Sequence, residues 1–388
     1  MAEKRPGTTP TSLTWRAAIA SRLHAHSLVE RAPRDALEDV IGAVCGIHAQ
    51  VMTAAELSIG TRVSMTRSEI RAALWNERRL VKTHGIRGTI HVFPSREFPM
   101  WRAALGARAD PGEAKRLAAL GLDRRQIDQI VDAIGEALDG RRLTLRALGE
   151  EVGARVGAWA LEGDISAFGG SWPKWRVGLG FAGVAGIVCF GPNQGTEVTY
   201  VRPDQWLGPW TPAEPEAALA EVFRRYLRAY GPATHRDFAQ WFRLRPPVAR
   251  EIADAMRDEL EEVDVEGYRC LRLRSDGADP PVAGSVRLLP HFDCYLRGSF
   301  PREQVAPDRP EKAAGGTGNV PTLIVDGVVA GVWEQRRTGK RLEVRVESFE
   351  KPTRARRAAL ESEVRRIGEI LETEATLTLG EVSARAHL

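Results

Sequence analysis

Apolar residues recur at helical spacing along the first part of the chain and then give way to strand-like residues. The spacing predicts three helices, over residues 14–28, 35–47 and 64–76. In the third helix, Thr66 and Glu69 occupy the two positions of a capping box. Residues 80–83 and 89–93 are typical of strands, with glycines marking the turn between them. Three helices followed by a β-hairpin are the layout of a winged helix.

The same order of elements is predicted twice more. In the second instance, helices are expected over residues 126–138, after Thr144 and over 172–179, with a hairpin over 186–201. The third instance is the clearest, because apolar residues from Leu219 onward follow helical spacing until Gly231 and Pro232 end the helix. A helix–turn–helix over residues 234–256 and a wing over 263–273 follow.

The pattern changes after residue 276. Segments 288–298, 321–333 and 341–349 are strand-like, with a hairpin signal at Asp326–Gly327. An amphipathic helix over residues 354–371 and a last strand over 375–379 complete the chain. We therefore predict an α+β fold of tandem winged-helix domains (helix–turn–helix plus wing) with a C-terminal α/β cap. The predicted domains span residues 12–110, 111–210, 211–280 and 281–388.

Composition narrows the possible chemistry. The net charge is +4 and arginine strongly outnumbers lysine, which is compatible with an anionic partner because guanidinium groups suit phosphate oxygens. The four cysteines are scattered, which argues against a zinc site, an iron–sulfur cluster or a disulfide framework. We expect no metal and no cofactor. Because there is neither a signal-peptide core nor a run of transmembrane length, we expect a cytoplasmic protein with no membrane association.

Two polar side chains, His48 and Gln50, interrupt the apolar stretch over residues 40–61. Residues i and i+2 diverge on a helix but share one side of an extended backbone. We therefore expect the helix to break near Gly46 or at His48, so that the pair projects together. Taken alone, the motif also fits a buried His and Gln that are hydrogen-bonded within a core. That is the commoner outcome among apolar neighbours.

Basic residues gather at two further places. A predicted hairpin turn around Gly339 carries four cations: Arg336, Arg337, Lys340 and Arg341. This turn is either a solvated charged loop or a finger that lies along a nucleic-acid backbone and displaces its counterions. Lys174 and Arg176 alternate with tryptophans on the predicted helix over residues 172–179. They are either exposed cations beside core tryptophans or contacts to DNA.

Several motifs together resemble those of one known family. They are Arg87-Gly-Thr-Ile-His-Val92, Tyr226-Leu227 with Gly231-Pro-Ala-Thr234 and Trp241, Leu289-Pro290 with Phe292-Asp293 and Tyr295-Leu296, and Asp326-Gly327 through Gly331 to Trp333. Over residues 12–381 the chain is similar to the tandem winged-helix bacterial DNA glycosylases of the AlkZ type. Members of that family excise N7-alkylated guanines, including bulky adducts and interstrand crosslinks made by natural products.

The resemblance implies a role for the His-Ala-Gln stretch. The family carries a catalytic Gln-x-Gln, or Gln-x-Asp in a sister branch, where this chain has His48-Ala49-Gln50. The His-x-Gln form is similar to that of some natural-product self-resistance glycosylases. The resemblance therefore implies that His48 and Gln50 are catalytic and that Arg87 contacts DNA. It also implies a monomeric enzyme of the nucleoid whose partner is double-stranded DNA carrying alkylated guanine.

The implied activity is that of a monofunctional DNA glycosylase, which leaves an abasic site and serves DNA repair and antibiotic self-resistance. Gln50 would orient the attacking water, and a neutral His48 would accept its proton, so we expect activity to rise through about pH 6–7. The alternative is a non-catalytic winged-helix DNA-binding protein or transcription regulator, in which His48 and Gln50 are structural.

Overall fold

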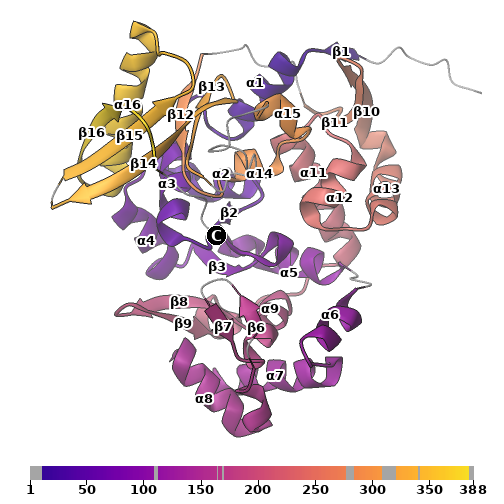
Figure 1. Cartoon of the computed structure of the whole chain (residues 1–388). Coiled ribbons are helices and arrows are strands. Elements are labelled where there is room, and N and C mark those ends of the chain that lie inside the picture. Colours follow the sequence, from indigo (N-terminus) through magenta and orange to yellow (C-terminus); the bar gives the residue numbers. More distant parts are fainter. Residues whose placement is uncertain are drawn as a thin grey trace, which may run out of the picture.

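The first unit of the protein lies at the centre of the molecule (Figure 1). The computed structural model describes residues 11–108, 112–163, 165–167, 170–276, 284–307, 320–339 and 341–383. The helices of the first unit are α2 (Leu37–Ala43), α3 (Met52–Arg62) and α4 (Arg67–Trp75). Its antiparallel sheet has the order β2 (Ile47–His48), β4 (Ile90–Pro94), β3 (Leu80–His84). The predicted capping box of Thr66 and Glu69 is confirmed at the start of α4.

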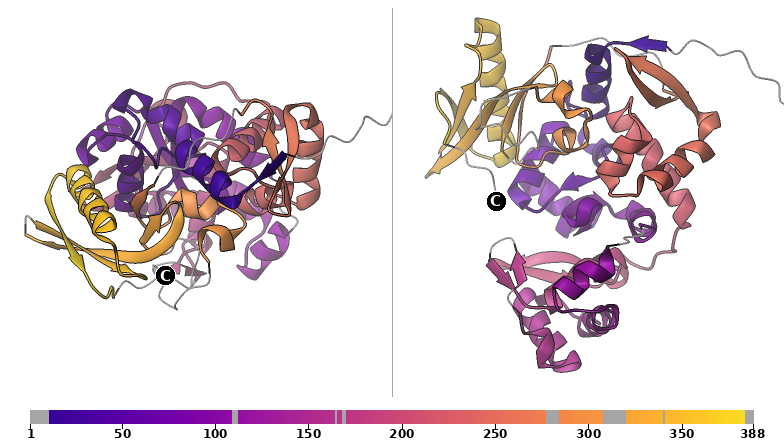
Figure 2. Two further views of the ribbon diagram at one scale, coloured as in Figure 1. Left: turned by 90° about the horizontal axis from the view of Figure 1, so that it is seen from above. Right: turned by 45° about the vertical axis from the view of Figure 1, so that its right-hand side comes forward.

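The second unit repeats this combination of helices and a small sheet, and it forms the lower part of the molecule in both Figure 1 and the right-hand view of Figure 2. Its helices are α6 (Glu113–Ala119), α7 (Arg124–Ala137), α8 (Leu145–Val156) and α9 (Trp175–Val184). Its three-stranded sheet has the order β5 (Leu143–Thr144), β9 (Glu197–Val201), β8 (Cys189–Gln194). The strands β6 (Ile165–Ala167) and β7 (Gly170–Trp172) form a separate pair. The helix predicted from residue 172 begins only at Trp175. Trp172 lies in β7 because Pro173 after it disfavours helical backbone.

The third unit contains a pairing that was not predicted. Its helices are α11 (Pro215–Tyr230), α12 (His235–Phe242) and α13 (Pro246–Ala255), followed by the hairpin β10 (Leu260–Val265) and β11 (Tyr268–Leu273). The strand β1 (Thr11–Leu13) adds to β10 in parallel, and α1 (Trp15–Ala25) follows it. The N-terminal segment therefore packs on the third unit. Two further helices, α5 (Phe98–Gly106) and α10 (Pro203–Trp206), lie in the links between units.

The C-terminal region is a five-stranded sheet covered by one long helix. The strand order is β12 (Val286–Leu289), β13 (Thr322–Val325), β14 (Val328–Thr338), β15 (Arg341–Ser348), β16 (Glu374–Leu379), with α16 (Arg354–Leu371) packed against it. The predicted turn at Asp326 and Gly327 is confirmed by the β13–β14 pairing. The same hydrophobic cluster includes Leu57 of α3, so the cap is packed directly on the first unit.

The strand predicted over residues 288–298 is wrong beyond Leu289. Pro290 has no amide proton for a ladder bond, and Asp293 instead caps the short helix α14 (Cys294–Gly298) by accepting the Tyr295 amide proton at 3.0 Å. The helix α15 (Arg302–Val305) follows. This change brings residues 292–297 out of the sheet and towards the first unit, where they bear on the candidate site.

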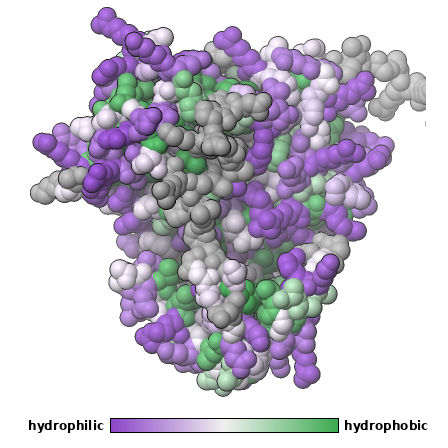
Figure 3. All heavy atoms as spheres, viewed as in Figure 1, coloured by the Kyte–Doolittle hydropathy of each residue, from purple (hydrophilic) through white to green (hydrophobic). Residues whose placement is uncertain are grey.

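Hydrophilic residues dominate the face seen in Figure 3, and apolar residues at the surface gather towards the second unit. In the part of the chain that the structure describes, no helix has the length and apolarity needed to cross a bilayer. The predicted α+β fold is confirmed.

Candidate functional site

The His48-Ala49-Gln50 stretch lies where a helix gives way to a strand. Helix α2 ends at Ala43, and Cys45 and Gly46 then adopt left-handed conformations, with φ values of 63° and 86°. The chain continues as β2, in which His48 pairs with His91 of β4. The predicted break near Gly46 is therefore confirmed, but only His48 of the expected pair lies in β2, and Gln50 follows it in a bend before α3.

The two polar residues of the motif differ in exposure. His48 is 8% exposed and Ala49 is fully buried, whereas Gln50 is exposed. The side-chain oxygen of Gln50 accepts the amide proton of Ile90 at 3.4 Å, and the Ile90 carbonyl accepts the amide proton of Ala49 at 2.7 Å. These bonds tie Gln50 to the first residue of β4, next to His91. Gln50 thus stands at the surface while His48 lies beneath it.

A narrow pocket surrounds the imidazole of His48. Residues from all parts of the fold except the second unit line it: Cys45, Gly46, His48, Ile86, Arg87, His91, Tyr230, Trp241, Phe292, Cys294 and Arg297. The space open to the centre of a water molecule is about 10 Å³, roughly what one water needs. The Nδ1 atom of His48 is buried and has no hydrogen-bond partner among the described residues. A single water is therefore the size of ligand that this pocket fits.

Backbone strain is concentrated at the same pocket. Nine described residues other than glycine have a positive φ, and three of them, Cys45, Arg87 and Phe292, line this one pocket. Left-handed backbone at such residues costs about 1–3 kcal/mol each and is retained mainly where the surrounding structure enforces it, as at active sites. The strain therefore makes this pocket a candidate functional site on grounds that are independent of the sequence motif.

Burial, together with the charges around His48, keeps its imidazole neutral. Burial, with smaller effects of the Arg297 and Arg87 guanidinium groups, lowers the pKa of His48 to about 3. Burial also holds the pKa of His91 well below its ordinary value, with the neighbouring His48 and Arg87 adding to the effect. The two imidazole rings lie 5.4 Å apart, and the Phe292 ring lies 4.8 Å from His48. His48 can therefore accept a proton only fleetingly at neutral pH.

This pKa changes the expected pH dependence. The rise in activity expected through about pH 6–7 is corrected, because His48 with a pKa of about 3 is neutral throughout that range. We expect the single-turnover rate constant of the folded protein to be flat between about pH 6 and 8.

The free energy of unfolding, in contrast, should fall as the pH drops below about 6.5, because the unfolded chain then binds protons that buried His48 does not. Rate constants and urea midpoints measured across this range check both outcomes; a sigmoidal rise in rate near pH 6.5 would contradict the first.

The residues predicted to bind DNA are not all gathered at this pocket. Arg87 lines it and donates to the Trp241 carbonyl at 3.3 Å, while burial lowers its pKa to about 10. Lys174 and Arg176 belong to the second unit, where Lys174 lies 3.9 Å from a carboxylate oxygen of Glu162. The Arg176 guanidinium stacks on Trp172 at 3.9 Å.

The basic hairpin is a third location, at one tip of the cap sheet (Figure 1). Arg336 and Arg337 are exposed on β14, and exposed Arg341 on β15 lies 3.7 Å from Glu374. Lys340 lies outside the described residues. The structure therefore brings Arg87 together with His48 in one pocket, leaves Gln50 outside its lining, and places the other candidate cations on separate surfaces.

Sequence reasoning missed part of the site. His91 was not among the predicted site residues, yet its ring lies beside His48. Phe292 and Arg297 had no predicted role. The only signal in the sequence was that Phe292 belongs to the Phe292-Asp293 motif and that Arg297 follows it closely. Within the described ranges, no group of three or more His, Cys, Asp or Glu residues is arranged to hold a metal ion.

Comparisons with known proteins show the family and an overall structural likeness. The family model described as "DNA glycosylase AlkZ-like" matches residues 41–370, which include the His-Ala-Gln motif. A curated "Interstrand DNA cross-link repair glycosylase" of Streptomyces sahachiroi is 32% identical over 336 residues, covering 83% of this chain and 88% of the relative. The solved structure of the Streptomyces sahachiroi DNA glycosylase AlkZ superposes with a TM-score of 0.77 at 27% identity, covering 95% of this chain and 100% of that one.

Proposed function

Since this chain belongs to the AlkZ-like DNA glycosylase family, we propose that it hydrolyses the N-glycosidic bond of N7-alkylguanine in double-stranded DNA. The observation that carries the proposal is a buried, neutral His48 in a pocket of one-water size, with exposed Gln50 two residues further along the chain. The relative from Streptomyces sahachiroi is an interstrand DNA cross-link repair glycosylase. Bulky and crosslinked natural-product adducts are therefore the proposed substrates, and self-resistance of an antibiotic producer is the proposed role.

The proposed reaction suits the charge state of this site. Alkylation at N7 gives guanine a positive charge, so the base departs as a neutral molecule and needs little general acid. The enzyme has to hold a water near C1′ and orient it. Water attacks C1′, the C1′–N9 bond breaks with its electron pair going to the base, and the water loses a proton. Gln50 orients the water and Nδ1 of neutral His48 accepts that proton.

The position of Lys82, away from His48, supports a monofunctional enzyme. Lys82 of β3 is the nearest amine in the first sheet, and burial lowers its pKa to about 8. Lys82 pairs in register with Val92, whereas His48 pairs with the next residue, His91. Because side chains alternate across a sheet, Lys82 and His48 point to opposite faces. Its ammonium lies over the Phe190 ring of the second unit at 4.8 Å, away from the His48 pocket. Hydrolysis to an abasic site, without a Schiff base, is the reaction proposed.

The architecture suggests how DNA would be held. We propose that the three repeats of helices and small sheets are winged-helix domains, with the boundaries expected from the sequence. The protein would act as a monomer on the nucleoid in the cytoplasm. Arg87 would lie nearest the scissile bond, and Lys174, Arg176 and the basic hairpin would contact the flanking backbone.

The test is a duplex oligonucleotide that carries one bulky N7-alkylguanine. The protein is incubated with it, abasic sites are cleaved with alkali, and the strand break is compared with spontaneous loss in a reaction without protein. Release of the modified base from the adducted strand supports the proposal. Binding of DNA with no release of the modified base above background, across several adducts, would contradict the proposal and favour a DNA-binding role. Activity on small methyl adducts alone would point to a housekeeping enzyme of broad scope.

The basic hairpin allows a separate prediction about affinity. Replacing both Arg336 and Arg337 by glutamine should weaken DNA binding in low salt and reduce the slope of log K against log salt by about 2, since each phosphate contact contributes about 0.9. Fluorescence anisotropy at several salt concentrations measures this slope. Arg354 and Arg365, both exposed on α16, provide a control pair of equal charge whose double replacement should leave the slope almost unchanged. Equal effects of the two double variants would mean that the hairpin has no special role.

A further inference from the structure

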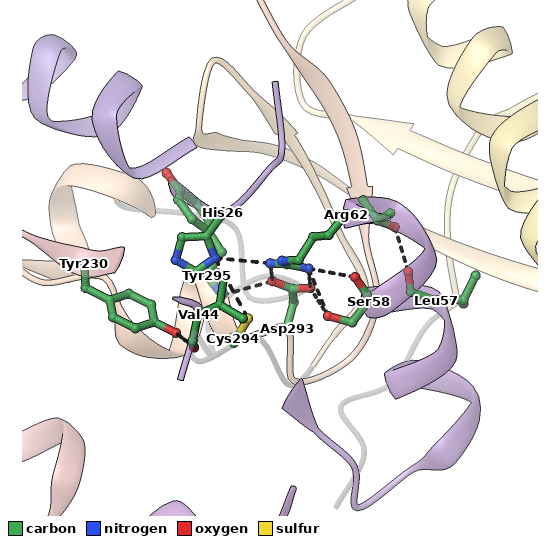
Figure 4. Close-up of polar contacts among 10 residues, drawn as sticks. His26, Val44, Leu57, Ser58, Arg62, Tyr230, Asp293, Cys294 and Tyr295 are labelled. Carbon is green, nitrogen blue, oxygen red and sulfur yellow. Dashed lines mark hydrogen bonds and ion pairs between the residues drawn. The ribbon is translucent and has the colours of Figure 1, made fainter. Parts of the chain in front are cut away.

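A buried ion pair joins helix α3 to the turn before α14 (Figure 4). Arg62 and Asp293 are 0% and 1% exposed, and two guanidinium nitrogens donate to the two carboxylate oxygens at 2.7 and 2.8 Å. The Ser58 hydroxyl donates to the same carboxylate at 2.7 Å, and the Tyr295 amide at 3.0 Å. Although burial alone raises the pKa of Asp293, the Arg62 guanidinium holds it below its ordinary value. The pair is therefore charged, and these hydrogen bonds fix the positions of both side chains.

The neighbours of Asp293 in the chain line the His48 pocket. Phe292 precedes it with a φ of 62°, and its ring lies 4.8 Å from that of His48. Asp293 also caps α14, and Arg297 of α14 lines the same pocket. One carboxylate thus sets the position of both an aromatic ring and a guanidinium group beside His48.

The other end of the ion pair leads back to the motif. Arg62 is the last residue of α3, a helix that begins two residues after Gln50. A helix is a stiff connection over this length, so the position of Arg62 is linked to that of the motif. The Arg62–Asp293 pair therefore closes a loop of contacts that runs from His48 through Phe292 and α3 back to Gln50.

We propose that Asp293, held by Arg62, is a positioning residue that sets Phe292 and Arg297 against His48, so that the C-terminal region completes the active site. The catalytic meaning of this inference rests on the proposed function. Stability alone does not account for the pair, because exchanging a buried ion pair for apolar residues is often neutral or stabilising. A bidentate fork, in contrast, fixes one geometry. The left-handed Phe292 next to it is the kind of strain that persists only where the surroundings enforce it.

The positioning can be measured without any substrate. In the free protein, the Phe292 ring shifts the imidazole proton resonances of His48 through its ring current. Phe292→Ala removes this shift and gives the reference value. We expect Asp293→Asn, which keeps the shape but loses the charge, to remove at least half of the same shift. Glu363→Gln is the matched control, because Glu363 is also a buried carboxylate paired with an arginine, at 3.2 Å from Arg287, but it lies outside the pocket. It should leave the His48 resonances unchanged.

The activity arm separates positioning from binding. With an adducted duplex, Phe292→Ala and Asp293→Asn should lower the single-turnover rate constant by about 10- to 100-fold, the cost of displacing a reacting group by a fraction of an ångström to an ångström. The dissociation constant for DNA should not change, and Glu363→Gln should leave both values as in the wild type. If the wild type releases no base, the proposed function fails, while the resonance measurement still decides the positioning.

One substitution guards against loss of folding. Should Asp293→Asn not fold, Arg62→Lys keeps the charge but cannot form the bidentate fork. We expect this variant to shift the His48 resonances in the same direction as Phe292→Ala. Wild-type resonances in whichever of these two variants folds would overturn the proposal.

Discussion

Replacing either His48 or Gln50 by alanine is expected to lower the single-turnover rate of base release by about 100- to 1,000-fold, the range seen when one positioned acid–base or polar group is removed from an active site. Each substitution removes one of the two groups proposed to hold the attacking water. Neither change removes an ion pair of the described residues, because neutral His48 takes part in none and Gln50 is uncharged and accepts the Ile90 amide proton. The dissociation constant for adducted DNA should therefore stay close to that of the wild type. Single-turnover assays with excess protein, together with anisotropy measurements of binding, give the two quantities separately.

Matched variants make this prediction sharper. His24, an exposed residue of α1, is the control for loss of an imidazole, and His24→Ala should keep full activity. His48→Gln should retain much of the activity, because the AlkZ-type resemblance gives glutamine at this position and an amide oxygen can still accept a hydrogen bond from water. Gln50→Glu keeps an acceptor but loses the amide donor. If His48→Ala and Gln50→Ala release base at the wild-type rate, the two residues are structural and the catalytic group lies elsewhere.

The part of the site that could be predicted from the sequence is the part that is local in the chain. Glycine at position 46 indicates the break, which is found directly before β2. The expected projection of His48 and Gln50 together is not found, because His48 is buried in β2 and Gln50 follows it at the surface. Phe292 and Arg297 could not be assigned in this way. They reach His48 only because Asp293 ends the strand and caps α14, and that depends on a long-range partner, Arg62.

The pH behaviour of the site shows the same limit. A histidine in a sequence is assigned a pKa near 6.5, which gave the expectation of activity rising through neutral pH. The low pKa of His48 comes from burial and from Arg297 and Arg87, which approach it in three dimensions. Desolvation and nearby charges of the same sign are properties of packing, so the protonation state could be predicted only from the structure.

The fold divides along similar lines. Capping residues, turn glycines and helical spacing identified the main hairpins of the three repeats and most of their helices, because these signals act within a few residues. Helices α3 and α6 were not predicted. The addition of β1 to β10 was not predicted, since it joins residues at opposite ends of a long stretch of chain. The strand expected over residues 288–298 failed because an apolar run with Tyr and Cys is equally compatible with a buried helix when its partner is unknown.

Gly46→Ala is expected to destabilise the protein strongly, because two costs act at this one position. Gly46 has a φ of 86°, and left-handed backbone costs an alanine about 1–2 kcal/mol. A Cβ atom here would also lie 2.4 Å from Cε1 of Phe93, a fully buried ring that stacks on Trp101 at 4.5 Å. Forcing extra volume into a packed core costs about 1–3 kcal/mol more. The free energy of unfolding should therefore fall by about 2–5 kcal/mol, as measured by urea denaturation at constant pH.

Gly88→Ala separates the two costs. Gly88 also has a positive φ, 73°, but a Cβ atom there meets no described heavy atom within 4 Å. This variant should lose only the backbone part, about 1–2 kcal/mol, so the difference between the two variants measures the contact with Phe93. Because β2 starts directly after Gly46, any relief of that contact has to move His48 as well. Equal losses in the two variants would mean that the turn before the motif yields easily. The rigid placement of His48, on which the proposed water site depends, would then have to come from Phe292 and Arg297 alone.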